Sequence, residues 1–159
     1  MAPPLLLISW LAACGTDPVR QDVTSYQAAM QPLLVENRQL AKGFEAMASE
    51  VKTNATDAPR IAEKLSKEIS PTADDLKARA EKIEPVTPQL GEAHALLVKA
   101  WTDRAAAYHQ MSDAWAANDP AGFESARQRN VQAKIDEEQF FQRVNQLAQP
   151  YGVEVDQYP

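Results

Sequence analysis

The sequence predicts an all-α protein, an up-down-up-down four-helix bundle whose second helix is kinked or split at Pro71. Three observations predict this class. Residues that favour helices (alanine, glutamine, glutamate and lysine) dominate the 159-residue chain, whereas glycine occurs five times. Apolar side chains recur every three or four residues in four long stretches. Most of the 11 prolines fall near the chain ends or at the borders of these stretches.

The first predicted helix covers residues 22–52. Its inward positions alternate between spacings of three and four without a slip, as expected for a helix that turns one face to a core. These positions are Tyr26, Met30, Leu33, Asn37, Leu40, Phe44, Met47 and Val51. Pro32 lies in the first turns, where we expect it to kink the helix or delay its start. Residues 52–57 form a predicted turn.

The second predicted helix covers residues 58–84 and is interrupted by a proline. Its inward positions are Ile61, Leu65, Ile69, Leu76, Ala80 and Ile83. Because Pro71 has no backbone N–H and its ring clashes with the preceding turn, we expect a kink or a break there. Thr72 is then the expected N-cap of a second half.

The third and fourth predicted helices cover residues 88–118 and 120–149. Each begins with a capping residue followed by a proline, Thr87 before Pro88 and Asp119 before Pro120. The third stripe is Leu90, His94, Leu97, Trp101, Arg104, Tyr108, Met111 and Trp115. The fourth is Phe123, Ala126, Asn130, Ala133, Glu137, Phe140, Val144 and Leu147.

Short connections between four helices favour a single bundle over residues 22–150, followed by a C-terminal tail, 151–159. The structural alternative is a long helical hairpin that dimerises. The three breaks between helices favour the intramolecular bundle.

Charge and cysteine content restrict the partners. The formal net charge is −6 and the isoelectric point is about 4.9, with no stripe dense in lysine and arginine. We therefore expect no nucleic-acid binding and no binding of anionic lipid through a basic helix. A lone cysteine, Cys14, excludes an intrachain disulfide and any multi-cysteine metal site.

The N-terminal segment has the pattern of a signal peptide. Residues 5–13 form an apolar run that ends in small residues and is too short to span a bilayer. Leu11-Ala12-Ala13-Cys14, followed by Gly15, resembles the lipobox of bacterial lipoproteins. The resemblance implies a signal peptide over 1–13, a diacylglyceryl group on Cys14 and a lipidated tether over 14–21. The alternative is an apolar N-terminus packed on the domain with Cys14 as a buried thiol.

The same resemblance implies a cellular location. An Asp directly after the lipidated cysteine retains enterobacterial lipoproteins in the inner membrane. Gly15 stands at that position, which favours the periplasmic face of the outer membrane. The expected partners are thus the membrane, through the lipid anchor, and a protein that the sequence does not identify.

Polar residues interrupt the inward stripes at one height. If the last two helices fold back near residue 119, Arg104 faces about position 134, within a turn of Glu137. If the first two fold back near residue 55, Asn37 faces about position 73, beside Asp74 and Asp75. We therefore predict a polar layer of Asn37, Asp74 or Asp75, Arg104 and Glu137. This layer either fixes the register of the helices as a structural network or forms a pocket in which Arg104 binds an anion.

Catalytic motifs are absent from the sequence. Gly91 and Ala106 stand three residues before His94 and His109, so the Glu-x-x-His motif of di-iron bundles does not occur. There is no G-x-S-x-G elbow and no glycine-rich phosphate loop. We expect no enzyme activity, no metal and no cofactor other than the lipid on Cys14.

These observations predict a membrane-anchored lipoprotein whose helical bundle is a non-catalytic envelope module, either structural or protein-binding. One alternative is a ligand-binding or sensory periplasmic bundle that uses the polar layer. Another is a periplasmic chaperone-like helical protein with an exposed apolar groove.

Overall fold

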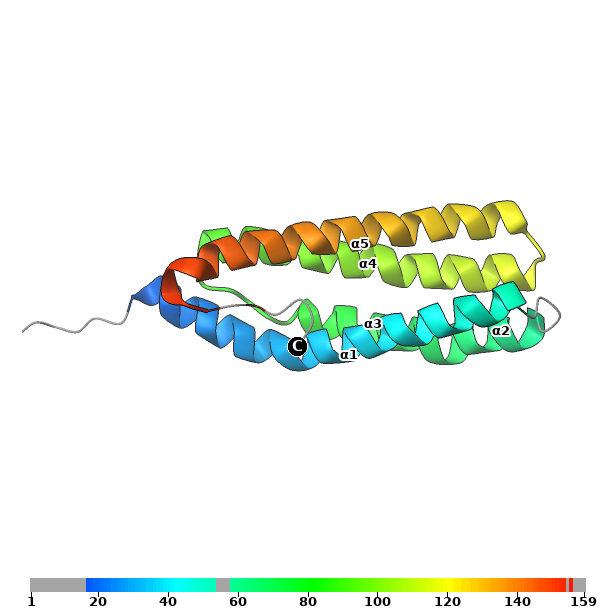
Figure 1. The fold of residues 1–159 in the computed structure, drawn as a ribbon, viewed down its shortest axis with the longest axis horizontal. Coiled ribbons are helices and arrows are strands. Elements are labelled where there is room, and N and C mark those ends of the chain that lie inside the picture. The colour runs from blue at the N-terminus through cyan, green and yellow to red at the C-terminus, as the bar shows by residue number, and fades with distance from the viewer. Residues whose placement is uncertain (1–16, 54–57, 154, 156–159) are drawn as a thin grey trace, which may run out of the picture.

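The computed structural model describes residues 17–53, 58–153 and 155, and every regular element in these ranges is helical. The elements are α1 (Pro18–Thr53), α2 (Ala58–Lys64), the π-helical segment η1 (Leu65–Ile69), α3 (Ser70–Ala80), α4 (Pro88–Ala116), α5 (Pro120–Ala148) and the 3₁₀ turn η2 (Gln149–Tyr151). Since α2, η1 and α3 follow one another directly, the described part of the chain has four long helical elements, and the fold is all-α (Figure 1). Among the described helices, none combines the length and apolarity needed to cross a membrane.

Helix α1 begins four residues earlier than the sequence predicts, at Pro18 instead of position 22. The cause is Asp17, whose Oδ1 accepts from the Val19 backbone N–H at 2.9 Å, while Pro18 takes the first helical position. Residues 18–21, predicted to be part of a tether, are therefore helical. Helix α1 begins before Pro32 and runs through it, so the expected delay of its start does not occur.

The second long helix continues through Pro71. The π-helical turn before the proline accommodates it: the N–H of Ser70 bonds to the carbonyl of Leu65, five residues back. The prediction that Thr72 is an N-cap is wrong. Its hydroxyl donates to the Glu68 carbonyl inside the helix. The helix ends at Ala80, four residues before the predicted boundary.

Helices α4 and α5 are joined by a tight turn. Asn118 has a positive φ of 52°, a conformation that asparagine tolerates better than most residues. Asp119 caps α5, with its Oδ1 accepting from the N–H groups of Ala121 and Gly122. The predicted cap of α4, Thr87, has an extended backbone but makes no side-chain cap bond to that helix.

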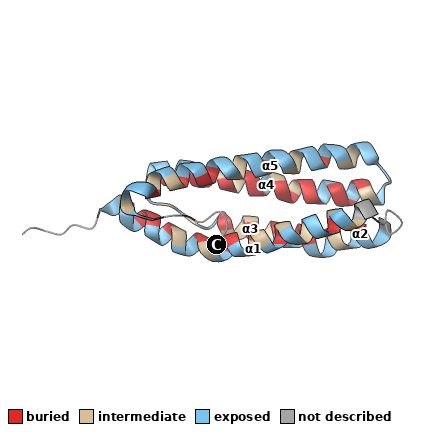
Figure 2. Cartoon of the chain, viewed as in Figure 1, coloured by how far each residue is buried: buried red, intermediate tan, exposed pale blue. Residues whose placement is uncertain are grey.

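Figure 1 shows α4 and α5 lying side by side, with α1 next to the α2–α3 helix. Helix α4 packs most extensively against α5 and also against α2 and α3, whereas α1 packs on α3 and approaches α5 less closely. The buried faces turn toward a shared interior (Figure 2). The largest side chains with almost no exposed surface include Trp101, Tyr108, Phe140 and Met30. The predicted apolar stripes therefore form the core.

The described residues after α5, up to Val155, are part of the domain. Gly152 adopts a left-handed conformation (φ 66°), which turns the chain back. Val155 then becomes completely buried, and its N–H donates to Oδ1 of Asn145 at 2.9 Å. Val153 also packs against the core, so the described part of the predicted 151–159 segment contributes to folding.

Candidate functional site

A buried polar cluster joins three helices at mid-height. Arg104 of α4 donates from Nη2 to Oε2 of Glu137 on α5 at 2.6 Å, and from Nη1 to Oδ1 of Asn37 on α1 at 2.7 Å. The Asn37 amide in turn donates to Oε1 of Glu137 at 2.8 Å. Arg104 is 6% exposed and Asn37 is 9% exposed. The structure thus brings together three of the five residues of the predicted polar layer.

Glu137 accepts from a third side chain, which the sequence did not predict. The indole Nε1 of Trp101 donates to Oε1 of Glu137 at 2.9 Å. Trp101 lies one turn before Arg104 on the same face of α4, so their shared stripe was the available signal. A buried ion pair is tolerated when additional hydrogen bonds satisfy its remaining polar atoms. Glu137, with donors from Asn37, Trp101 and Arg104, meets that condition.

Asp74 and Asp75 lie outside the cluster. Asp74 pairs with His109 at 2.8 Å and Asp75 with Arg79 at 3.1 Å, and their side chains are 48% and 62% exposed. The physical reason is helical azimuth, because Ala73 and Leu76 occupy the buried positions of α3. The prediction that the aspartates lie near Asn37 used only their height along the helix and not the direction of their side chains. Their side chains point away from the interior.

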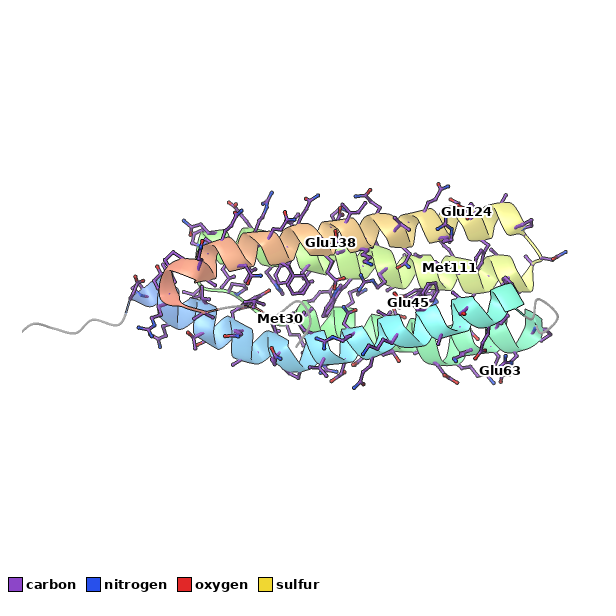
Figure 3. All side chains as sticks on the ribbon, in the orientation of Figure 1. Met30, Glu45, Glu63, Met111, Glu124 and Glu138 are labelled. Carbon is purple, nitrogen blue, oxygen red and sulfur yellow. The ribbon has the colours of Figure 1, made fainter. Side chains whose placement is uncertain are left out.

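A cleft of about 290 Å³ lies over the polar cluster, between α1 and α5, which pack less extensively on each other than α4 and α5 do. Asn37, Arg104 and Glu137 form part of its lining. Leu34, Phe44, Val131 and Phe141 supply apolar wall. The charged lining residues Arg38, Lys42, Glu45, Lys134 and Glu138 come from α1 and α5. Figure 3 shows Glu45 on α1 and Glu138 on α5.

Two further polar side chains reach the cleft. Tyr108, from α4, is 1% exposed, and its ring packs on Phe44 with centroids 4.8 Å apart. Its hydroxyl makes no hydrogen bond to another described residue. Burial raises the pKa of Tyr108 to about 12, so the hydroxyl remains a proton donor at neutral pH. Asn130 of α5 also lines the cleft, and its amide has no hydrogen bond within the described chain.

His94 has a structural role at one end of the domain. Its Nδ1 lies 2.9 Å from the Tyr26 hydroxyl and its Nε2 lies 3.0 Å from the carbonyl of Ala80. Because a carbonyl only accepts, Nε2 carries the proton and Nδ1 accepts from Tyr26. Burial lowers the pKa of His94, and the bond to Ala80 opposes this in part. His94 thus links α1 to the end of α3.

Among the described residues, no group of three or more histidine, cysteine, aspartate or glutamate side chains is arranged to hold a metal ion. The predicted lipidation residue, Cys14, lies outside the described ranges.

Comparison of this chain with protein-family models, with curated proteins and with solved structures found no match.

Proposed function

We propose that this protein is a bacterial lipoprotein whose four helices form a non-catalytic, up-down-up-down bundle tethered to the envelope through lipid on Cys14. The observation that carries the proposal is the apolar run 5–13 ending in Leu11-Ala12-Ala13-Cys14. Helix α1 begins at Pro18, so three residues separate the lipidated cysteine from the domain. A lipid there would hold the domain close to the membrane surface.

The lengths of the connections support the up-down-up-down order. Four residues separate α1 from α2, seven separate α3 from α4 and three separate α4 from α5. Connections this short join antiparallel neighbours. The packing of α1 on α3, of α3 on α4 and of α4 on α5 follows the same order.

The way buried polar groups are used supports a binding or structural role. The Glu137 carboxylate accepts from three side chains, and both ring nitrogens of His94 are engaged by Tyr26 and Ala80. Groups held in this way fix helices relative to one another and have little freedom to exchange protons with a substrate. This pattern is typical of a polar network that specifies register.

A Cys14→Ala variant tests the anchor. We expect the wild-type chain to partition with membranes and to carry the mass of a lipid, with residues 1–13 removed. The Cys14→Ala variant should lose both properties. Thr16→Ala, two residues from the cysteine, is the matched control and should behave as the wild type. A wild-type protein that is unlipidated and retains residues 1–13 would overturn the proposal.

The proposed membrane location follows from the residue after the cysteine. Gly15 favours the periplasmic face of the outer membrane, and an aspartate there would favour retention in the inner membrane. Density-gradient separation of the two membranes should find the wild type in the outer-membrane fraction and Gly15→Asp in the inner-membrane fraction. The same location for both proteins would contradict this part of the proposal.

A second candidate function is ligand binding within the bundle. The cleft between α1 and α5 favours it, since this space combines an apolar wall, a polar floor and charged groups at its rim. Sites for small molecules usually combine these features, in volumes of about 300–1,000 Å³. At about 290 Å³ the cleft is at the lower end of that range, so its occupant would be small.

A further inference from the structure

The charged rim of the α1–α5 cleft holds side chains of both signs that do not pair with each other. Lys42 and Glu45 come from α1, and Lys134 and Glu138 come from α5. None of the four forms an ion pair within the described ranges. Between α4 and α5 such neighbours do pair, as Lys99 does with Asp103 and Asp136. With Arg38, which also lines the cleft, the rim carries three cations and two anions.

The heights of these groups follow from one contact between the helices. Asn37 bonds to Glu137, and Figure 1 shows α1 and α5 running in opposite directions. At 1.5 Å per residue, Lys42 and Lys134 therefore lie within about 3 Å of the same height, on opposite sides of the cleft. Glu45 lies about one helical turn further along, near the level of Asn130. A cationic centre is thus followed directly by an anionic end.

The interior of the cleft supplies the second, independent observation. Tyr108 is 1% exposed and lines the cleft, and its hydroxyl has no hydrogen-bond partner among the described residues. The hydroxyl oxygen is not one of the fully enclosed polar atoms without a partner, so it is reached from the cleft and can donate to a ligand or a water there. The apolar wall of Leu34, Phe44 and Phe141 adjoins it. Polar and apolar surfaces for one small molecule are therefore adjacent.

We infer that this cleft binds a small zwitterion of the α-amino acid class with an apolar side chain, an inference that rests on the ligand-binding candidate above. The ligand carboxylate lies between Lys42 and Lys134, where two cations from facing helices meet. Its ammonium group lies toward Glu45, and its side chain packs on the apolar wall. Tyr108 and Asn130 complete the set of polar contacts. A ligand with one charge would leave one sign of the rim without a counter-charge.

Three compounds that share one apolar group test the charge requirement. L-Phenylalanine carries both charges, 3-phenylpropanoate lacks the ammonium group, and phenethylamine lacks the carboxylate. Isothermal titration calorimetry on the full chain in detergent should give binding of phenylalanine at least about tenfold tighter than either analogue, because each analogue loses one set of charge-assisted hydrogen bonds.

Substitutions at the rim give a readout that general destabilisation would not produce. Lys134→Gln should reduce the preference for phenylalanine over phenethylamine, whereas Glu45→Gln should reduce the preference over 3-phenylpropanoate. Tyr108→Phe removes only the hydroxyl and should weaken phenylalanine binding. Lys82→Gln, in the turn after α3 and outside the cleft, is the matched control and should bind as the wild type does.

The outcomes separate the inference from the function on which it rests. Equal or tighter binding of either singly charged analogue would overturn the zwitterion inference and leave the ligand-binding candidate standing. Absence of binding by all three compounds at millimolar concentration would overturn both. Phenylalanine binding that Lys134→Gln, Glu45→Gln and Tyr108→Phe leave unchanged would show that the ligand sits elsewhere and would also overturn the inference.

Discussion

Asp22, in the first turns of α1, accepts two hydrogen bonds from Thr87, the residue that precedes α4. Its Oδ2 lies 2.7 Å from both the backbone nitrogen and the hydroxyl oxygen of Thr87. Its Oδ1 accepts from the Val86 backbone N–H at 3.0 Å. Since the side chain of Thr87 does not cap α4, the carboxylate of another helix fixes the start of α4 instead.

We predict that Asp22→Ala destabilises the protein by about 1–3 kcal/mol, because it removes the charged acceptor of the hydrogen bonds from Val86 and Thr87. Burial raises the pKa of Asp22, but the hydrogen bonds from Thr87 and Val86 outweigh it, so the pKa lies below its ordinary value. This contribution to stability is therefore present above about pH 4 and is lost as the pH falls through the lowered pKa. Urea unfolding at pH 7 and pH 3 checks both effects. A smaller difference between wild type and variant at pH 7 than at pH 3 would contradict the assignment.

The Arg104–Glu137 pair predicts a large effect of a single substitution. Arg104→Leu should lower the free energy of unfolding by about 3–5 kcal/mol, because the Glu137 carboxylate stays buried without its cation. The double variant Arg104→Leu, Glu137→Leu should recover part of the loss, since it removes the uncompensated charge. Arg129→Leu, which breaks a more exposed pair with Asp103, is the control and should cost less than about 1 kcal/mol. An Arg104→Leu protein as stable as the wild type would contradict the pairing.

The four helices could be predicted because their apolar stripes have an unbroken period, and the structure buries Met30, Leu97 and Val144 as that period requires. The contact of Arg104 with Glu137 could be predicted by counting residues in both directions from the turn near residue 119. The exclusion of Asp74 and Asp75 did not follow, because counting gives height along a helix and says nothing about azimuth. Leu76, an inward position of the predicted stripe, already carried that information, because it is buried directly after Asp75.

Other features of the fold depend on three-dimensional geometry that no local sequence pattern predicts. The π-helical turn at Leu65–Ile69 accommodates Pro71 without a break, whereas a proline in an α-helical pattern predicts an end or a kink. Val155 is buried through a turn at Gly152 and one bond to Asn145, and no periodic pattern marks such a segment. The cleft arises from the spacing between α1 and α5, which no single helix determines.

The buried His94 predicts a pH dependence of stability. Burial holds the pKa of His94 below its ordinary value of about 6.5, only partly opposed by the bond to Ala80. Between the folded pKa and pH 6.5 the unfolded chain binds a proton that the folded chain does not, so stability falls as the pH falls through this window. His94→Gln should weaken this dependence, as measured by urea unfolding between pH 7 and pH 5. An unchanged slope in the variant would contradict the role assigned to His94.

Two glycines provide a matched test of local packing in the helices. At Gly122 an added Cβ would meet the Asp119 carboxylate that caps α5 and would lie 3.3 Å from the Cβ of Ala114. Gly122→Ala should therefore displace the cap and destabilise the protein by about 1 kcal/mol. At Gly91, within α4, an added Cβ would meet nothing within 4 Å. Gly91→Ala should stabilise the protein by about 0.4–1 kcal/mol, because alanine restricts the unfolded chain and favours the helix. Thermal and urea unfolding of the two variants should shift in opposite directions. Equal shifts would mean that the Asp119 cap contributes nothing beyond helix propensity.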